Sequence, residues 1–206
     1  MKVAVVGGTG AFGTAVAARL REAGYDVVIG SRDADRAAAA AGRIGVEGAT
    51  NADAVRTADF VVLATKADGA IETARELREA IGATPVLSVA AELRFTPAGV
   101  EPTLEATSIA QRVQAELDAP VVAGLHSLAA SNLAGARAPD EDALVCGDDA
   151  AAKALALEVA GRITNGRAVD AGPLAGARAL EGMTAVIVNV NKRYRAHAGL
   201  RITGLH

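Results

Sequence analysis

The residues with the clearest chemistry form a glycine-rich turn close to the start of the chain. Gly8, Gly10 and Gly13 follow a short apolar run and fit the pattern G-x-G-x-x-G. In such a turn the first glycine allows a tight bend, the second lets the backbone approach a pyrophosphate, and the third lets a helix pack on the strand. The next residues, about Ala11 to Ala23, are predicted to be a helix whose amino-terminal amides face the phosphates. The turn predicts a bound dinucleotide; the alternative is a glycine turn that binds nothing.

A second chemically specific pair ends the next apolar run. Ser31 and Arg32 stand where a site for NAD would carry Asp or Glu to bind the ribose 2′-hydroxyl. A hydroxyl and a guanidinium bind a 2′-phosphate instead, and Arg36 falls on the same helical face. Asp33 is predicted to cap the helix that follows. These residues favour NADP over NAD, the alternative for Arg32 being a solvated surface arginine.

Other polar residues allow two interpretations each. His126 follows an apolar strand, so it either bonds to a cofactor ring or is a structural histidine bonded to backbone. Lys66 also follows a strand, and it either approaches a cofactor or lies solvated in a loop. The acidic run 140–142 is expected to be a solvated loop. No His, Cys and carboxylate set has the spacing of a metal site, so no metal is predicted.

Apolar runs and helical patterns alternate through the first two-thirds of the chain. This alternation predicts an α/β fold, a doubly wound parallel sheet of the Rossmann type. Asn51 is expected to be the N-cap of the third helix. The predicted strands lie near 2–6, 26–30, 60–64, 85–89, 121–125 and 143–146. The predicted helices lie near 11–23, 33–42, 51–57, 69–81 and 105–118.

The last part of the chain has a different character. An alanine-rich helix is predicted over 150–162, and a long apolar helix runs from Ala175 to about Tyr194. The apolar residues of the long helix are nearly continuous, which favours burial, for instance against a second subunit. We therefore expect a dinucleotide-binding domain over 1–147 and a small helical, dimer-forming region over 148–206.

Composition excludes several classes of partner. The chain has 206 residues, a net charge of −3 and 2% aromatic residues, so it lacks the basic and stacking surface that nucleic acid requires. Cys146 is the single cysteine, which excludes an intrachain disulfide. No apolar run is long enough to span a membrane, and glycines break the first run too early for a signal peptide. The expectation is a cytoplasmic protein.

Several motifs together resemble one enzyme family. Besides the two nucleotide motifs, they are Gly124-Leu125-His126-Ser127, the run from Val145 to Asp149, and the run from Asp170 to Leu174. They are similar to those of the NADPH-dependent reductases of the deazaflavin coenzyme F-420, and the resemblance covers essentially the whole chain. It implies hydride transfer between C4 of the nicotinamide and C5 of the deazaflavin, in a homodimer.

The resemblance also implies roles for residues. Thr9 to Phe12 would hold the pyrophosphate, Ala130 would lie by the nicotinamide, and the deazaflavin would face His126, Ser127 and Leu128. The full set expected to contact NADP(H) is Gly8, Thr9, Gly10, Ala11, Phe12, Gly13, Ser31, Arg32, Arg36, Lys66, Val89 and Ala130.

Three segments, 65–67, 89–92 and 128–130, lack prolines that the family carries around the deazaflavin. Glu92 also brings a negative charge close to an anionic cofactor. These differences motivate two alternatives. One is an NADPH-dependent reductase of a small imine or carbonyl compound, with His126 or Lys66 as proton donor. The other is a non-catalytic protein that senses NADP(H).

Overall fold

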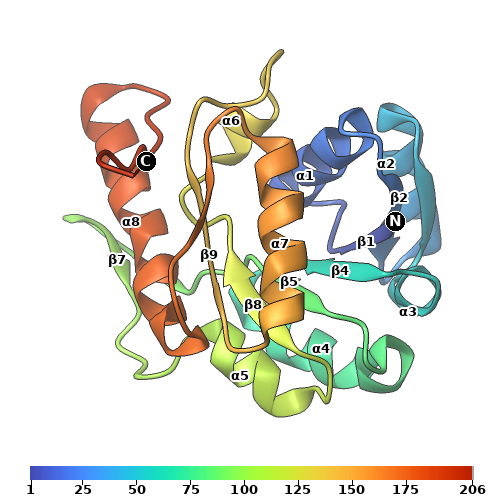
Figure 1. Cartoon of the computed structure of the whole chain (residues 1–206). Coiled ribbons are helices and arrows are strands. Elements are labelled where there is room, and N and C mark those ends of the chain that lie inside the picture. Colours follow the sequence, from blue (N-terminus) through green and yellow to red (C-terminus); the bar gives the residue numbers. More distant parts are fainter. Residues whose placement is uncertain (206) are drawn as a thin grey trace.

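The computed structural model describes residues 1–205, and a single eight-stranded sheet forms its centre (Figure 1). The strand order β10-β9-β8-β5-β4-β1-β2-β3 has the crossovers of a doubly wound α/β fold. The strands of this sheet are β1 (Lys2–Val6), β2 (Asp26–Ser31), β3 (Glu47–Thr50), β4 (Phe60–Leu63), β5 (Val86–Ser88), β8 (Val121–Gly124), β9 (Ala143–Gly147) and β10 (Ala168–Asp170). The predicted fold class is confirmed.

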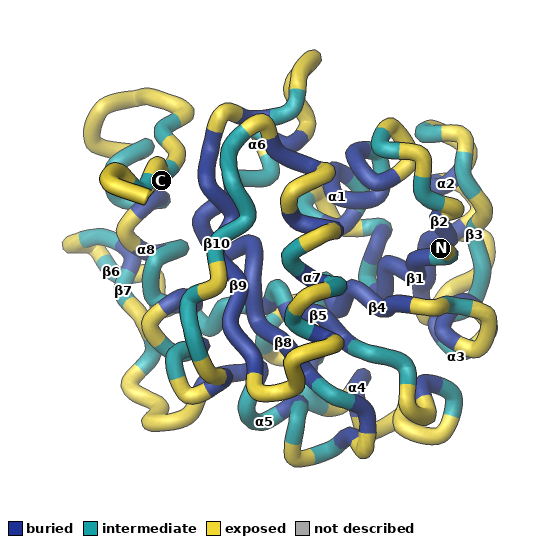
Figure 2. The backbone as a smooth tube through the Cα atoms, in the orientation of Figure 1, coloured by how far each residue is buried: buried dark blue, intermediate teal, exposed yellow. Residues whose placement is uncertain are grey.

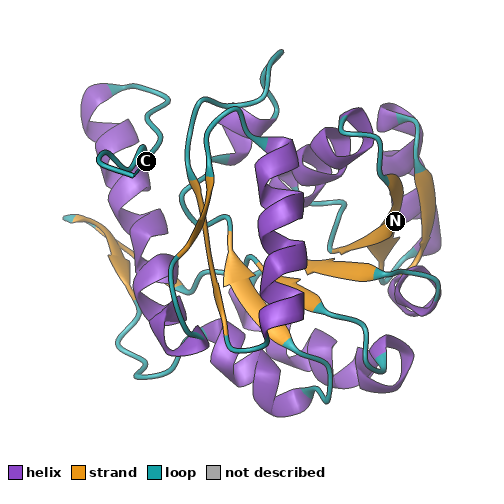
Figure 3. Cartoon of the chain, in the orientation of Figure 1, coloured by secondary structure: helices purple, strands orange, loops and turns teal. Residues whose placement is uncertain are grey.

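Helices cover both faces of the sheet, as Figure 3 shows. They are α1 (Ala11–Glu22), α2 (Ala34–Ile44), α3 (Asn51–Arg56), α4 (Ala67–Ile81), α5 (Ile109–Glu116), α6 (Ala130–Leu133), α7 (Ala150–Ile163) and α8 (Ala177–Tyr194), the last preceded by a 3₁₀ turn, η1 (Leu174–Gly176). Alternate residues of β1 enter two cores. Val3 and Val5 pack with α1, α2 and α7, whereas Ala4 and Val6 pack with α3, α4 and α5.

The sheet is not parallel throughout. β9 pairs antiparallel with β8, and β10 pairs parallel with β9, so the last two strands run against the other six. A parallel return from β8 would need a crossover along the length of the sheet, usually a helix of a dozen residues or more. The segment between β8 and β9 holds only the four-residue helix α6. It therefore stays at the edge where β8 ends, and β9 starts from that same edge.

The chain after residue 147 does not form a purely helical region. β10 belongs to the same sheet as β1, so the described part of this region, residues 148–205, completes the central sheet as well as supplying α7 and α8. Its three residues are only partly buried, and Figure 2 shows this outer strand less buried than the neighbouring β9 and β8. A strand this short has no visible alternation in the sequence.

A β-hairpin stands apart from the main sheet. β6 (Leu93–Thr96) and β7 (Gly99–Pro102) pair antiparallel, and β7 packs against α8. The carboxamide of Asn189 on α8 bonds to the backbone of β7 in the way that a neighbouring strand would. It accepts a hydrogen bond from the amide of Val100 at 2.8 Å and donates one to the carbonyl of Val100 at 2.7 Å. The hairpin thereby fixes α8 beside the carboxyl ends of β5 and β8.

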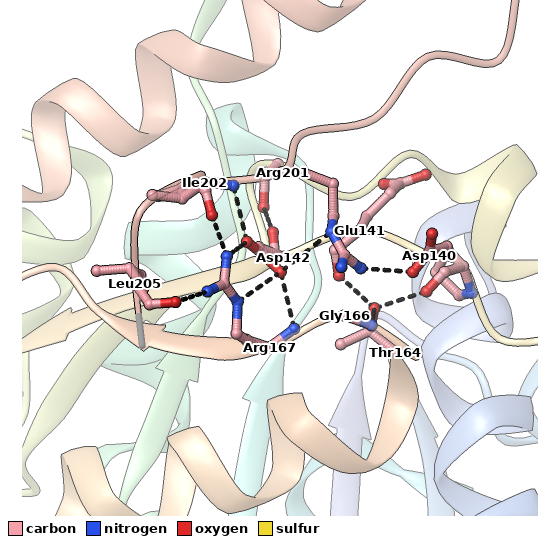
Figure 4. A network of polar contacts seen from close by, with 11 residues as sticks. Asp140, Glu141, Asp142, Thr164, Gly166, Arg167, Arg201, Ile202 and Leu205 are labelled. Carbon is pink, nitrogen blue, oxygen red and sulfur yellow. Dashed lines mark hydrogen bonds and ion pairs between the residues drawn. The ribbon is translucent and has the colours of Figure 1, made fainter.

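The carboxyl-terminal tail is tied to the sheet by a polar network (Figure 4). The carboxylate of Asp142 is fully buried and accepts hydrogen bonds from the guanidinium of Arg167 and from the amide of Ile202, each at 2.8 Å. Glu141 is buried as well, at 6% exposure. The prediction that 140–142 is a solvated loop is therefore wrong for two of its three residues. The charge of Asp142 looks solvent-exposed in the sequence because its partners lie 25 and 60 residues away.

Among residues 1–205, every helix is too short or too polar to cross a bilayer.

Candidate active site

The glycine turn joins β1 to α1 at the carboxyl edge of the sheet. Gly7 has a φ of 77°, so the left-handed position falls one residue before the first glycine of the predicted pattern. A Cβ on Gly13 would lie 2.8 Å from the carbonyl oxygen of Gly7, which shows that this glycine permits α1 to approach the strand. The hydroxyl of Thr14 donates to the carbonyl of Gly8 at 2.7 Å and braces the bend.

Two cavities meet at this turn. The first, about 650 Å³, runs from the turn across the end of β2 to α4. The second, about 410 Å³, runs from the turn toward β5, β8 and α8. Both are lined by Gly10, Ala64, Thr65 and Lys66. One elongated ligand, or two ligands end to end, can therefore occupy a continuous cleft along the carboxyl edge, where open α/β sheets bind their ligands.

The first cavity is polar and is lined by charges of both signs, with Arg32 and Arg36 beyond the end of β2 and Asp68, Glu72 and Glu76 on α4. Ser31, at the end of β2, and the exposed Arg32 and Arg36 line it. Among residues 1–205 neither guanidinium forms an ion pair. Asp33 accepts from the amide of Arg36 at 3.0 Å and caps α2, as predicted. The carboxylate of Asp33 thus bonds to the start of α2, and the two arginines remain available for an anion.

The second cavity is lined mainly by apolar side chains. Its walls come from segments far apart in the sequence: the start of α1, the loops after β4, β5 and β8, and the middle of α8. The apolar lining residues include Phe12, Val89, Leu93, Leu125, Leu128 and Val188. A largely apolar cavity beside a polar one that contains two arginines suits a cofactor that has a heterocyclic ring at one end and phosphates at the other.

His126 lines the apolar cavity but is itself buried, with 6% exposure. Its Nε2 lies 3.1 Å from the carbonyl oxygen of Ala90, so Nε2 carries the proton and Nδ1 is an acceptor. Nδ1 is buried without a partner among residues 1–205. Burial lowers the pKa of His126 to about 4, against 6.5 normally, and the bond to Ala90 only partly opposes this. His126 is therefore neutral at pH 7 and is not a general acid there.

The residue before His126 makes the bend. Leu125 has a φ of 65°, the left-handed region that favours glycine, and it is fully buried. The preceding glycine, Gly124, does not make the bend, because it is the last residue of β8 and has no positive φ. Strain of this kind is found at sites where the surroundings impose a special backbone path. Here it turns the chain from the strand into the wall of the cavity.

Of the other residues predicted in this segment, two line the apolar cavity and one does not. Leu128 and Ala130 line the apolar cavity, together with Val89. Ser127 is not among the lining residues; its side chain is buried and its hydroxyl donates to the carbonyl of Asp142 at 2.8 Å. Ser127 thus joins the cavity wall to the polar network that holds the tail.

Of the remaining predicted contacts, Thr9 and Gly10 line the polar cavity, and Ala11, Phe12 and Gly13 line the apolar one. Gly8 lines neither cavity and serves the turn itself. Lys66 lies at their junction, exposed, immediately before α4. The charge of Glu92 is balanced by Arg112 at 3.4 Å, and Glu92 lines neither cavity. It therefore opposes an anionic ligand less than its position in the sequence suggested.

Two features of the site carry no sequence signal. Thr184 and Val188 of α8 line the apolar cavity, and the hydroxyl of Thr184 donates to the carbonyl of His126 at 3.1 Å. Arg19 of α1 is buried, at 6% exposure, and donates to the carbonyl of Leu133 at 2.7 Å and to that of Arg137 at 2.7 Å. Arg19 therefore fastens the dinucleotide helix to the loop after the cavity wall, more than 110 residues away.

Fold and cleft together define an NADP-dependent oxidoreductase of the Rossmann type. The chain belongs to the F420-dependent NADP reductase family. Residues 2–92 match the family described as NADP oxidoreductase coenzyme F420-dependent.

Two relatives and one solved structure illustrate the similarity. The F420-dependent NADP reductase of Methanothermobacter thermautotrophicus is 35% identical over 222 residues, covering 100% of this chain and 96% of the relative. That of Methanocaldococcus jannaschii is 32% identical over 223 residues, covering 100% and 99%. The crystal structure of a protein described as a putative F420-dependent NADP reductase from Arthrobacter sp. FB24 superposes with a TM-score of 0.84 at 28% identity, covering 99% of this chain and 100% of that one.

Proposed function

We propose that the protein transfers a hydride between C4 of the nicotinamide of NADPH and C5 of the deazaflavin of coenzyme F-420. In the direction of deazaflavin reduction, NADPH gives up the hydride and becomes NADP⁺, and the deazaflavin takes up the hydride and one proton. The observation that carries the proposal is the meeting of a polar cavity, with two arginines beyond the end of β2, and an apolar cavity at Gly10 and Lys66, in a chain of this family.

The polar cavity supports assignment of the phosphate end of NADPH. The pyrophosphate lies over Thr9 to Phe12, where the amides at the start of α1 point outward. Ser31, Arg32 and Arg36 bind the 2′-phosphate through a hydroxyl and two guanidiniums. Lys66, between the cavities, is placed to contact the middle of the dinucleotide.

The apolar cavity supports assignment of both rings. We place the nicotinamide beside Val89 and Ala130, and the deazaflavin against His126 and Leu128. Ser127 contributes by holding this wall through the carbonyl of Asp142. Direct transfer between two stacked rings needs no nucleophile, only close positioning and exclusion of water. The neutral state of His126 at pH 7, with a proton on Nε2 alone, is compatible with such a reaction.

The neutral state of His126 at pH 7 weakens the alternative of an imine or carbonyl reductase. That chemistry needs a proton donor beside the substrate, and His126, with a pKa of about 4, does not supply one at neutral pH. Lys66 is then the remaining donor of the two considered.

A direct assay tests the proposal. Purified protein is mixed with NADPH and oxidised coenzyme F-420, and the loss of deazaflavin absorbance is followed between pH 5 and 9. We expect turnover with NADPH and much less with NADH. A panel of imines and carbonyl compounds, and FMN in place of the deazaflavin, are the comparisons. Absence of deazaflavin reduction across this range would reject the proposal, and NADPH oxidation by a member of the panel would favour the alternative.

We also propose that the protein is a cytoplasmic homodimer whose contact lies in the region 148–206. Both substrates are soluble cofactors, which supports the cytoplasm as the place of reaction. The dimer is supported by an apolar stripe on α8 formed by Ala179, Met183, Val186 and Val190, of which Val186 is 58% exposed. Light scattering should give the mass of two chains, and Val186→Arg should give the mass of one. A wild-type protein of one chain at micromolar concentration would reject the dimer.

A further inference from the structure

Asn51 lies in the wall of the polar cavity, beside the residues assigned to the 2′-phosphate. It lines this cavity together with Ser31, Arg32 and Arg36. The pairing of β2 with β3 brings this about, since Thr50 is the register partner of Ser31 and Asn51 follows at once. The side chain is 9% exposed. A buried polar group is thus present at the end of the cavity where a phosphorylated ribose is expected.

In residues 1–205 no hydrogen bond to the Asn51 carboxamide is formed. The sequence predicts Asn51 as the cap of α3, but Thr50 fills that role, its hydroxyl accepting from the amide of Asp53 at 3.2 Å. The Oδ1 of Asn51 is buried and has no hydrogen-bond partner among residues 1–205. Leaving a buried acceptor unpaired costs stability, so such groups in a folded protein call for an explanation, often a functional one.

The neighbouring strand leaves room for this side chain. Gly30 of β2 lies directly against it: a Cβ on Gly30 would be 2.8 Å from Oδ1 of Asn51 and 3.3 Å from its Cα. Any side chain at position 30 would displace the carboxamide from the cavity wall. The glycine that precedes Ser31 therefore serves the position of Asn51.

We infer that Asn51 is a further NADP-binding residue, which hydrogen bonds to the adenosine ribose and its 2′-phosphate. The inference rests on the proposed function, because it assumes the 2′-phosphate site at Ser31 and Arg32. A carboxamide offers an acceptor and two donors. The acceptor suits the ribose 3′-hydroxyl, and a donor suits a phosphate oxygen. Rotation of the amide about its last torsion presents either end to the ligand.

The uncharged state of Asn51 matters for the choice between NADP and NAD. A carboxylate at this position would accept from the two hydroxyls of an unphosphorylated ribose and would repel a 2′-phosphate. Asn51 is therefore a specificity-determining residue as well as a contact. Asn51→Asp should weaken NADPH selectively, whereas Asn51→Ala should weaken NADPH by loss of hydrogen bonds alone.

The test measures dissociation constants of NADPH and NADH by calorimetry, and melting temperatures without ligand. We expect Asn51→Asp to raise the Kd of NADPH about tenfold or more, with NADH changed less than about threefold. Asn51→Ala should raise the Kd of NADPH about fivefold without lowering the melting temperature, because the group removed has no partner. Asn165→Asp adds the same charge near β10, at the opposite end of the sheet, and should bind as the wild type does.

The contrary results are distinct. If both Asn51 variants bind NADPH as tightly as the wild type while Arg32→Ala binds it weakly, the inference is overturned and the proposed function stands. A lower melting temperature of Asn51→Ala with equal weakening of both nucleotides shows a structural role and also overturns it. A wild type that binds no NADPH overturns both. If Asn51→Asp does not fold, the alanine variant decides.

Discussion

Arg32 and Arg36 lie on the wall of the polar cavity with exposed guanidiniums, and among residues 1–205 no carboxylate pairs with either. Arg32→Ala should therefore weaken NADPH far more than NADH. The expected loss is about 1.5–3 kcal/mol, the worth of a hydrogen bond to a charged group. This corresponds to a rise in Kd of roughly 10- to 150-fold.

Arg43→Ala is the matched control for this prediction. Arg43 is exposed in the last turn of the same helix, α2, and does not line the cavity. It should leave both dissociation constants unchanged. Equal weakening of NADPH and NADH by Arg32→Ala would show that Arg32 does not contact the 2′-phosphate.

The burial of His126 leads to a second prediction, on how the free energy of unfolding depends on pH. Its folded pKa of about 4 lies below the ordinary 6.5, so the unfolded chain takes up the proton first as the pH falls. The stability that neutral His126 contributes is complete above pH 6.5 and is lost as the pH drops toward 4. The loss between pH 7 and 4.5 should be on the order of 2–3 kcal/mol.

Urea unfolding of the wild type and of His126→Gln, between pH 4.5 and 7.5, measures this. Glutamine keeps an N–H to donate to Ala90 but does not titrate. The difference between the two free energies of unfolding should change across this window in favour of the variant at low pH. A difference that stays constant would show that His126 is accessible and titrates normally.

The residues that sequence could reveal are those whose role is local. The glycine turn, the Ser31–Arg32 pair and the Asp33 cap each depend on neighbours within a few positions, and each lies where the pattern predicted. Asn51 was assigned the wrong role, because its position in the cavity arises from the pairing of β2 with β3. Leu125 adopts a backbone angle that its residue type does not announce.

At the scale of elements, α1 and α6 are fastened together by Arg19. Its guanidinium donates to the carbonyls of Leu133, Gly135 and Arg137 and also pairs with Glu22. The loop held in this way follows Ala130, which lines the apolar cavity. Arg19 thus ties the helix proposed to bind the pyrophosphate to the segment that follows Ala130, the residue proposed to flank the nicotinamide.

Arg19→Met should loosen this connection. Loss of the donors leaves the buried carbonyl of Leu133 unpaired, along with two half-buried carbonyls, and we expect a destabilisation of about 2–4 kcal/mol in urea unfolding. The KM for the deazaflavin should rise more than the Kd of NADPH, because α1 keeps its contacts with the sheet. Arg21→Met, an exposed neighbour on α1, is the control and should change neither. A variant that loses stability but keeps its KM would limit Arg19 to a structural role.

The long, regular elements were predictable because their apolar periodicity is strong. The predicted α1, α2, α4, α7 and α8 agree with the structure to within a few residues. β3 was missed, since Glu47-Gly48-Ala49-Thr50 has no apolar alternation and is recognisable only by its pairing with β2. The β6–β7 hairpin is not predictable from apolar alternation, because Val100 is the one buried residue of its two strands. β9 runs antiparallel to β8 because the segment between them is short, and the spacing of apolar residues does not reveal the direction of a strand.

At the scale of the whole molecule, Asp142 links the carboxyl-terminal tail to the sheet and to the cavity wall. Its carboxylate holds Arg167 and Ile202, and its carbonyl accepts from Ser127. The guanidinium of Arg167 holds the pKa of Asp142 well below its usual range. Its contribution to stability is therefore complete above pH 3.8 and is lost only as the pH falls below that value.

Asp142→Asn should lower the free energy of unfolding by about 2–3 kcal/mol, by weakening an ion pair with one buried partner. The difference from the wild type should be constant from pH 5 to 8 and should shrink below about pH 4, where Asp142 of the unfolded chain takes up a proton and the folded carboxylate does not. Asp140→Asn removes the neighbouring exposed carboxylate and should cost much less. Equal effects of the two substitutions would show that the buried network does not hold the tail.

The central claim is direct hydride transfer between two rings that share one cleft, and isotope transfer measures it most directly. NADPH carrying deuterium at the transferred position of C4 is incubated with oxidised coenzyme F-420 and the protein in ordinary water. The reduced deazaflavin is then analysed by NMR and mass spectrometry. The account predicts one deuterium at C5 of the deazaflavin and none released to water. Reduced deazaflavin without deuterium at C5 would contradict it.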